Sequence, residues 1–412
     1  MFIKHYRKTY LIFAALIIFI HPAVLAQIKS PSFRLASEKG FVKVPFELFE
    51  NNILIQFRIN NSQPVWCIFD TGASINVLDK NLAAQLGLVN NGTANLNAGG
   101  GAVEGTVVEN AAVSLPGVEA FQQRIALVSL DILPPYFGRR VQGIIGTDFI
   151  KNFVVVIDHA GQTLTFYNYK IYNLSKDPQA IAIKNIDNVP YTEIELLLDG
   201  NKTIAADFEL DTGSSRSLQI NRPFANKNKI LDTLPKLKTA EGIGGAGVGG
   251  DTSFIDARIN ALRIGRYKFK NPIISISQDT EGTGAGQDAG LIGTEIFRRF
   301  TVVLDYESQK ILLKPNKFFN EPFESDLSGL ELITGTNNFN EIRIKVVRKD
   351  FPANRAGLQA GDEIISINGR SIKKFNLDKL SKMFKQPGKE YLLTIKRQNK
   401  TVIVKLKLKR LI

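Results

Sequence analysis

A repeated motif constrains the fold of this chain more than any other feature. The segment Phe69-Asp70-Thr71-Gly72-Ala73-Ser74 returns 141 residues later as Leu210-Asp211-Thr212-Gly213-Ser214-Ser215. A second pair lies downstream, at 143–149 and 290–296, and reads Gly-Ile-Ile-Gly-Thr-Asp-Phe and Gly-Leu-Ile-Gly-Thr-Glu-Ile. Two matching blocks in the same order indicate two duplicated halves, because internal repeats of this kind mark repeated structural units.

Both halves have the residue pattern of β-strands. Runs such as 53–59 and 153–157 are rich in β-branched and aromatic residues, and Asn, Gly and Pro separate them. The clearest helix signal is 81–86, with Asp79 as its N-cap and Gly87 after its last turn. We therefore expect an all-β architecture of two pseudo-twofold-related halves, at 27–178 and 179–316.

The first 26 residues have the pattern of a secretory signal. Basic residues at positions 4, 7 and 8 precede an apolar run at 11–20, and a small-residue exit ends at Ala26. The apolar run is shorter than the roughly 20 residues needed to cross a bilayer. We expect an exported protein that begins at Gln27 and lies in the periplasm, on the cell surface or in the medium; an uncleaved anchor is the alternative.

The scarce residues exclude several chemistries. There is one cysteine, Cys67, and of three histidines the mature chain keeps only His159. One thiol closes no internal disulfide, and so few Cys and His residues make no Cys/His metal centre. Serine and cysteine hydrolases normally need a histidine beside the nucleophile, and His159 lies in a predicted turn. Hydrolytic chemistry would therefore depend on carboxylates, without metal or cofactor.

The two Asp-Thr-Gly motifs predict a pair of carboxylates. If the halves pack symmetrically, Asp70 and Asp211 meet at the axis, and Gly72 and Gly213 allow an approach of the backbones that a Cβ would block. Two carboxylates about 3 Å apart cannot both be ionised, so they share one proton. The ionised member would take a proton from a water that attacks a carbonyl carbon, while the protonated member supports the developing oxygens. The predicted reaction is peptide-bond hydrolysis.

The side chains around the acids predict supporting roles. We expect Thr71 and Thr212 to hydrogen-bond to the opposite loop and hold the carboxylates nearly coplanar. Ala73 lacks the hydroxyl that Ser214 carries in the second motif. We expect the Ser214 hydroxyl to hydrogen-bond the Asp211 carboxylate and favour its ionised form, which would leave the shared proton more often on Asp70.

These motifs resemble those of retropepsin-like aspartic proteases, here with two retroviral-type halves fused in one chain. The resemblance covers roughly residues 41–315 and implies an all-β aspartic protease fold acting on polypeptides. In that family the apolar-apolar-Gly segment packs behind the catalytic loop, and a Gly-rich β-hairpin flap closes over the substrate. The candidate flap residues are Gly99, Gly100 and Gly101 in the first half, and Gly244, Gly245 and Ala246 in the second. A flexible solvent loop is the alternative for each.

A linker at 317–327 leads to residues 328–412, which resemble an α+β PDZ domain of the bacterial protease-associated type. The resemblance rests mainly on 351–369, which ends in the tight-turn pair Asn368-Gly369. Such domains bind a peptide as an added strand. The expected groove residues are Gly329, Leu330, Glu331, Leu332, Leu377 and Leu380.

Two features of the PDZ segment bear on its partners. Glu331 replaces the second glycine of the family's Gly-Leu-Gly-Phe pattern, so we expect internal strand binding or tethering rather than capture of a terminal carboxylate. Between 328 and 412 there are 19 Lys and Arg against 7 Asp and Glu. Because Lys alternates with apolar residues at 402–409, solvated faces are favoured over acidic partners or a membrane surface. We expect no nucleic-acid binding and no membrane contact after signal cleavage.

The sequence thus predicts an exported aspartic endopeptidase whose PDZ module recruits substrate or regulates access. The alternative is a non-catalytic peptide-binding protein on the same folds.

Overall fold

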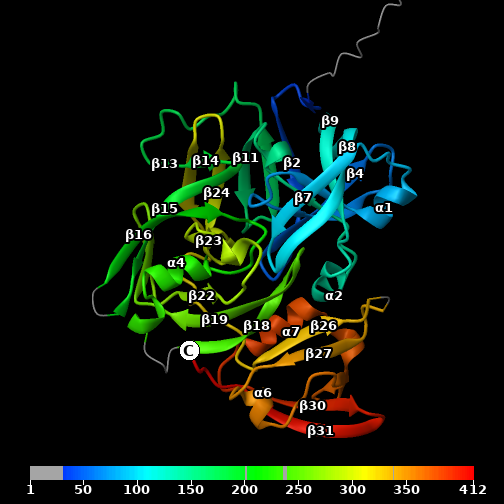
Figure 1. Ribbon diagram of the computed structural model, residues 1–412, viewed down its shortest axis with the longest axis vertical. Coiled ribbons are helices and arrows are strands. Elements are labelled where there is room, and N and C mark those ends of the chain that lie inside the picture. Colours follow the sequence, from blue (N-terminus) through cyan, green and yellow to red (C-terminus); the bar gives the residue numbers. More distant parts are fainter. Residues whose placement is uncertain (1–30, 200–201, 235–238, 337) are drawn as a thin grey trace, which may run out of the picture. The chain divides into compact units, whose positions relative to one another are not determined.

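The computed structural model describes residues 31–199, 202–234, 239–336 and 338–412 (Figure 1). The predicted signal peptide lies outside these ranges. No helix within them is long and apolar enough to cross a membrane.

The first half folds into a sheet with the order β1-β9-β6-β10-β5-β4-β8-β7, and β3 pairs with β4. Its strands alternate buried and exposed side chains where one face is covered, as in β4, because successive residues point to opposite faces. The strands are β1 (Ser32–Leu35), β3 (Glu47–Phe49), β4 (Asn52–Ile59), β5 (Val65–Phe69), β6 (Asn76–Asp79), β7 (Gly92–Ala98), β8 (Gly101–Leu115), β9 (Val118–Val128) and β10 (Gly143–Ile145).

The second half forms a sheet with the order β18-β19-β22-β17-β23-β16-β15-β20-β21, and β14 pairs with β15. The strands are β14 (Lys184–Ile186), β15 (Val189–Leu197), β16 (Thr203–Leu210), β17 (Leu218–Ile220), β18 (Thr239–Gly247), β19 (Gly250–Arg258), β20 (Ala261–Ile264), β21 (Tyr267–Lys270), β22 (Ile273–Ser277) and β23 (Gly290–Ile292).

The strand pairs around the two Asp-Thr-Gly motifs match. β5 pairs with β4 antiparallel and β10 parallel, and β16 pairs in the same way with β15 and β23. β6 and β17 are each antiparallel to the apolar-apolar-Gly strand of their own half. The two acidic loops therefore leave equivalent points of two similarly connected sheets.

A six-stranded sheet combines strands of both halves in the order β13-β25-β24-β11-β12-β2. At its centre β11 and β24 are antiparallel, with Val156 opposite Val303. The strands are β2 (Phe41–Pro45), β11 (Val154–Asp158), β12 (Thr163–Tyr167), β13 (Ile181–Ala182), β24 (Phe300–Asp305) and β25 (Lys310–Pro315). One apolar core runs through both halves, with Phe57, Phe149, Phe208 and Phe297 fully buried.

Short helices complete the two halves. The helix predicted at 81–86 is α1 (Lys80–Gln85), and the Asp79 carboxylate caps it by accepting from the amides of Asn81 and Leu82. His159 lies in the predicted turn between β11 and β12, where burial lowers its pKa to about 4. The other helices are α2 (Leu133–Phe137), α3 (Thr147–Ile150), α4 (Arg222–Lys227), α5 (Thr294–Phe297), η2 (Leu231–Thr233) and η4 (Thr283–Ala285).

The segment after β25 packs on the second half before the chain enters its last domain. Phe319 and Phe323 lie against the core, and the buried Arg299 guanidinium donates to backbone carbonyls of this segment, including that of Glu321. Glu295 provides the opposite charge, with its Oε1 2.8 Å from Arg299 Nη2. The predicted linker is therefore an ordered part of the fold.

The C-terminal domain has its own apolar core under a sheet of order β26-β27-β28-β30-β31, with β29 beside β28. Asn376 caps α7, whose buried residues Leu377, Leu380 and Phe384 follow helical spacing. The elements are β26 (Leu330–Thr334), β27 (Ile342–Val347), α6 (Pro352–Arg355), β28 (Glu363–Ile367), β29 (Arg370–Ser371), η5 (Ile372–Lys374), α7 (Leu377–Phe384), β30 (Glu390–Arg397) and β31 (Lys400–Lys407).

Candidate active site

The two Asp-Thr-Gly loops lie together because each is fixed at the end of a buried strand. The Asp70 amide donates to the Ile145 carbonyl, and the Asp211 amide donates to the Ile292 carbonyl, both at 3.0 Å. Each apolar-apolar-Gly segment therefore lies directly beside the motif strand of its own half. The side chains of Asp70 and Asp211 hydrogen-bond to each other.

The two threonines hold the loops together across the interface between the halves. The Thr71 amide donates to Thr212 Oγ1 and the Thr212 amide donates to Thr71 Oγ1, both at 3.0 Å. The Thr212 hydroxyl donates to the Phe69 carbonyl at 2.9 Å, and the Thr71 hydroxyl donates to the Leu210 carbonyl. Both threonines are buried, so these four hydrogen bonds satisfy groups that water does not reach.

Each carboxylate is also held by its own loop. Asp70 Oδ1 accepts from the Gly72 amide at 2.8 Å, and Asp211 Oδ1 accepts from the Gly213 amide at 2.7 Å. A Cβ added at Gly213 would lie 2.4 Å from Asp70 Cγ, and one at Gly72 would lie 2.8 Å from Asp211 Cγ. Glycine is therefore required at both positions by the opposing carboxylate.

The Ser214 contact differs from the sequence-based expectation. The Ser214 hydroxyl does not form the predicted bond to Asp211; it accepts from the Arg216 amide at 3.4 Å, while the Ser214 amide donates to Asp211 at 3.2 Å. Burial raises the pKa of both acids, and the negative charges of Asp70 and Glu209 also raise that of Asp211. These conditions favour a pair that keeps one proton, and which aspartate carries it stays a prediction.

Glu209 is a third carboxylate that the motif analysis missed. It lines the same cavity as the two aspartates, and burial together with the charges of Asp70 and Asp288 raises its pKa to about 8. Its Oε1 lies 2.4 Å from the position of a Cβ added to Gly72. The signal was present in the sequence, because side chains two residues apart on a strand point to the same face.

The Gly-rich segments form two β-hairpins. In the first, β7 and β8 turn at Gly99 and Gly100, as predicted. In the second, the turn lies at Val248 and Gly249, and the predicted flap residues Gly244, Gly245 and Ala246 belong to β18 of this hairpin, beside a register shift between Ile243 and Ala246. The Gly249 amide donates to the Gly99 carbonyl at 2.9 Å.

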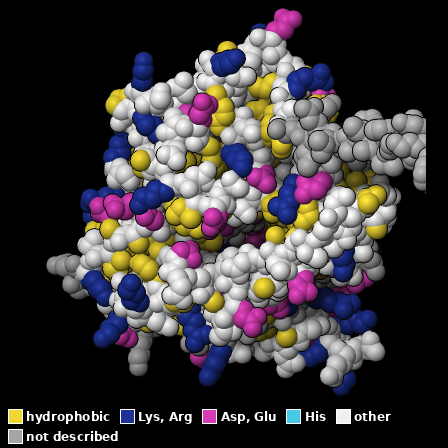
Figure 2. Space-filling view, turned by 45° about the horizontal axis from the view of Figure 1, so that its top comes forward, with side chains coloured by type: hydrophobic (Ala, Val, Ile, Leu, Met, Phe, Trp, Pro, Cys, Tyr) yellow, Lys and Arg dark blue, Asp and Glu magenta, His cyan; other side chains and the backbone are white. Residues whose placement is uncertain are grey.

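The two hairpin tips touch backbone to backbone. A Cβ at Gly247 would lie 2.2 Å from the Gly99 carbonyl oxygen, and one at Gly100 would lie 2.4 Å from that of Gly250. Glycine is needed at this contact because a side chain would separate the hairpins. A cavity of about 750 Å³ is bounded by residues of both acidic loops and both hairpins. The space-filling view shows a hollow near the centre of its face, with acidic side chains around it (Figure 2).

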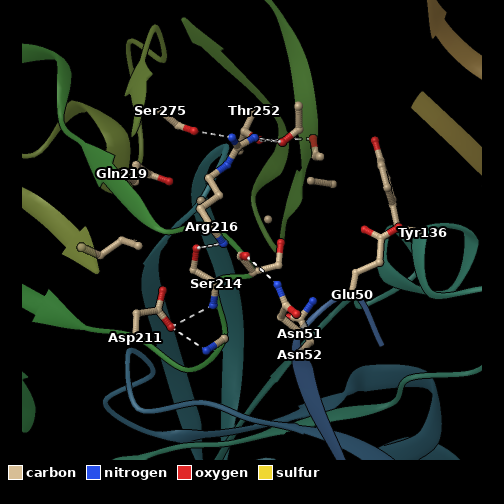
Figure 3. A pocket seen from close by; sticks show the side chains of 18 of the residues that line it. Glu50, Asn51, Asn52, Tyr136, Asp211, Ser214, Arg216, Gln219, Thr252 and Ser275 are labelled. Atoms are coloured by element: carbon tan, nitrogen blue, oxygen red, sulfur yellow. Dashed lines mark hydrogen bonds between the residues drawn. The ribbon is translucent and has the colours of Figure 1, made fainter. Parts of the chain in front are cut away.

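Arg216 connects the second acidic loop to the second hairpin (Figure 3). Its guanidinium donates to the Gly244 carbonyl, to Ser275 Oγ and, at 3.1 Å, to Asp256 Oδ1. It also stacks 3.8 Å from the centre of the Phe254 ring. The position of β18 and β19 is therefore tied directly to the loop that carries Asp211.

The C-terminal domain contributes to the same cavity. Arg348 Nη1 lies 2.9 Å from Asp256 Oδ2, and the Gly245 amide donates to Glu331 Oε1 at 3.2 Å. Burial by itself would raise the pKa of Asp256. The charges of Arg216 and Arg348 nevertheless hold this pKa below its usual value. Lys345 pairs with Asp251 on β19.

The predicted PDZ groove faces residues of the first half. The Thr334 hydroxyl on β26 donates to the Pro135 carbonyl of α2 at 3.1 Å, and a Cβ at Gly138 would lie 3.7 Å from Leu377 Cδ1. Of the expected groove residues, Leu380 is instead fully buried in the domain core. The others line the shared cavity: Gly329, Leu330, Glu331, Leu332 and Leu377.

Across the described ranges, no cluster of three or more His, Cys, Asp or Glu side chains is arranged to hold a metal ion. Cys67 is buried on β5, where burial raises the pKa of its thiol.

Comparison with known proteins agrees with this architecture. Residues 55–149 match the family model for aspartyl protease, and residues 322–396 match that for the PDZ domain. The chain thus combines an aspartic-protease domain with a C-terminal PDZ domain, which confirms the resemblance inferred from the motifs. The first match includes Asp70; in the second half the assignment rests on the motif and the strand pairing. A search of the curated proteins gives no match.

Three solved structures are similar to parts of the chain. A retropepsin-like aspartic protease from Rickettsia conorii is 19% identical, with 34% of this chain and 94% of that chain covered and a TM-score of 0.24. Basic 7S globulin from soybean is 11% identical, with 67% and 96% covered and a TM-score of 0.37. A photosystem II D1 C-terminal processing protease is 17% identical, with 23% and 25% covered and a TM-score of 0.20.

Proposed function

We propose that the protein is an exported aspartic endopeptidase that hydrolyses peptide bonds with a water activated between Asp70 and Asp211. The observation that carries the proposal is the hydrogen-bonded carboxyl pair, held by Thr71 and Thr212 and facing a cavity under two hairpins. Raised pKa values for both acids support a state with one shared proton.

In the proposed mechanism the ionised member of the Asp70–Asp211 pair takes a proton from the water as its oxygen attacks the peptide carbonyl carbon. The protonated member donates a hydrogen bond to the carbonyl oxygen as negative charge develops there. The amides of Gly72 and Gly213 hold the carboxylates in place without reorganising. The hairpins would cover the bound peptide and exclude water from the developing charge.

The test is a cleavage assay with the chain from Gln27 onward. Denatured proteins and peptide mixtures are incubated at pH 3 to 7, and mass spectrometry identifies new amino termini. The Asp70→Asn/Asp211→Asn double variant provides the background. A non-catalytic peptide-binding protein would give the same termini in both samples, and that result would refute the proposal.

The proposed export depends on residues 1–26, which lie outside the described ranges. The pattern of a basic start, an apolar run and a small-residue exit predicts cleavage after Ala26. Amino-terminal sequencing of the protein recovered outside the cytoplasm is expected to begin at Gln27. Recovery with Met1 retained would indicate an anchor instead.

We assign the PDZ domain a regulatory role at the second hairpin. Arg348 and Glu331 contact Asp256 and the Gly245 amide, so the domain restrains the hairpin that borders the cavity. A peptide that entered between β26 and α7 would displace α2 and change these contacts. Once opened, the same groove would also recruit substrate as an added strand.

This role predicts that Arg348→Ala loosens β18 and β19. Hydrogen bonds to charged groups contribute about 1.5–3 kcal/mol, so amide exchange at residues 244–258 should accelerate by about tenfold or more if hairpin opening breaks this contact. The matched control is Lys405→Ala, which removes an exposed ion pair with Glu390 on the other edge of the domain. Equal exchange in both variants would show that the domain does not restrain the hairpin.

A further inference from the structure

The two walls of the cavity that flank the aspartates differ chemically at matched positions. The strand pairing places Ile68 opposite Ile144, and Glu209 opposite Leu291. In the same way Val77 pairs with Ile144 and Gln219 with Leu291. Ile68, Val77 and Ile144 thus correspond to Glu209, Gln219 and Leu291, and all six line the cavity.

On the first half the three matched positions are all apolar. Ile68, Val77 and Ile144 belong to one hydrophobic cluster, together with Leu54, which lies opposite Ile68 on β4. The corresponding residue on β15 is Tyr191, opposite Glu209, and its hydroxyl forms a hydrogen bond with that carboxylate. Of the three matched positions, the second wall therefore carries a carboxylate at Glu209 and an amide at Gln219 where the first has aliphatic side chains.

Glu209 has no positive partner within the described ranges. The charges that act on it, from Asp70 and Asp288, are both negative. The nearby Arg216 is already committed to Asp256, Ser275 and the Gly244 carbonyl. Ionising a partly buried carboxylate that has no cation beside it is costly, and an opposite charge placed there restores the ionised form.

We propose that the cleft selects a polypeptide with a cationic side chain, Lys or Arg, seated against Glu209 on one side of the scissile bond and an apolar side chain against Ile68 on the other. The inference builds on the proposed function and names its substrate class. A ligand ammonium or guanidinium supplies the missing cation, while Ile68, Val77 and Ile144 offer only dispersion contacts and burial. Glu209 acts here as a specificity-determining residue, since the proton transfers belong to the aspartates.

The test uses two sets of matched peptides that differ at one position beside an apolar residue. Position X precedes the apolar residue in one set and follows it in the other, and X is Lys, norleucine or Glu. In one set the wild-type kcat/KM should be about 10- to 100-fold higher for Lys than for norleucine, as expected for a hydrogen bond to a charged group. Cleavage without this preference in either set would overturn the inference while leaving the proposed function intact.

The variants separate the charge from the fold. Glu209→Gln and Glu209→Ile should each bring the ratio of kcat/KM for the Lys and norleucine peptides close to one, and Ile68→Glu should gain a Lys preference in the opposite peptide set. Thermal unfolding confirms that each variant is folded.

The same peptides are also tested for binding to Asp70→Asn, by fluorescence anisotropy, so that selectivity is measured even if no peptide is cleaved. Equal binding of the Lys and norleucine peptides there would refute the inference by itself.

Discussion

Replacing Asp70 or Asp211 by Asn is expected to lower kcat/KM by roughly 10²- to 10⁴-fold, because either substitution removes one of the two carboxyl groups that share a proton in the proposed mechanism. The asparagine oxygen can still accept from the Gly72 or Gly213 amide, so the loops should keep their positions. Initial rates on a cleaved peptide measure the loss. Activity near the wild-type level in either variant would exclude the proposed mechanism.

The same variants should fold at least as well as the wild type. Folding raises the pKa of both acids above its ordinary value of 3.8, so above that pH the folded chain holds protons that the unfolded chain has released. The wild type therefore loses stability as the pH rises, and a variant with one such acid fewer loses less. Melting temperatures at pH 5 and pH 8 measure this difference. A variant destabilised at both pH values would make its loss of activity uninformative about catalysis.

Replacing the threonines is expected to damage both stability and activity. Thr71→Val keeps the shape but removes the hydroxyl that accepts from the Thr212 amide and donates to the Leu210 carbonyl. Each buried donor or acceptor left without a partner lowers the free energy of unfolding by about 1–3 kcal/mol. Since small displacements of reacting groups cost about 100-fold in rate, kcat/KM should fall by a similar factor. Urea unfolding and peptide hydrolysis measure the two effects.

The matched control is Thr71→Ser, which keeps the hydroxyl and removes one methyl group. It should retain most of the activity, while Thr71→Val and Thr212→Val should each lose it. The double Val variant should lose less free energy of unfolding than the two single variants lose together, because all four hydrogen bonds join the same two loops. If Thr71→Val behaves like Thr71→Ser, the hydroxyl does not position the acids.

The centre of the site was predictable because it depends on short, repeated segments. Asp70 and Asp211 stand at the same place in two copies of one motif, and each glycine and threonine beside them has a role set by the close approach of the loops. The α1 cap at Asp79 was predictable for a similar reason, since its partners lie two and three residues away. Local spacing determines contacts of this kind.

Other details were missed because several contacts compete for the same groups. The Ser214 hydroxyl accepts from the Arg216 amide, while Asp211 Oδ1 accepts from the Ser214 amide. The exact turn of the second hairpin lies at Val248 and Gly249, after the predicted flap glycines, and β18 has a register shift against β19. Leu380 has groove-like spacing with Leu377 but faces the domain core.

The sequence by itself determined that two similar β halves would each present one acid at the end of an apolar strand, because strand periodicity and the motif repeat are written in neighbouring residues. The folded structure alone brings Asp70, from the other half, close enough to Glu209 and Asp211 for its charge to raise the pKa of both. It also decided that the C-terminal domain meets the second hairpin through Arg348 and Glu331. Both outcomes depend on distances and burial between segments far apart in the chain, which no local pattern specifies.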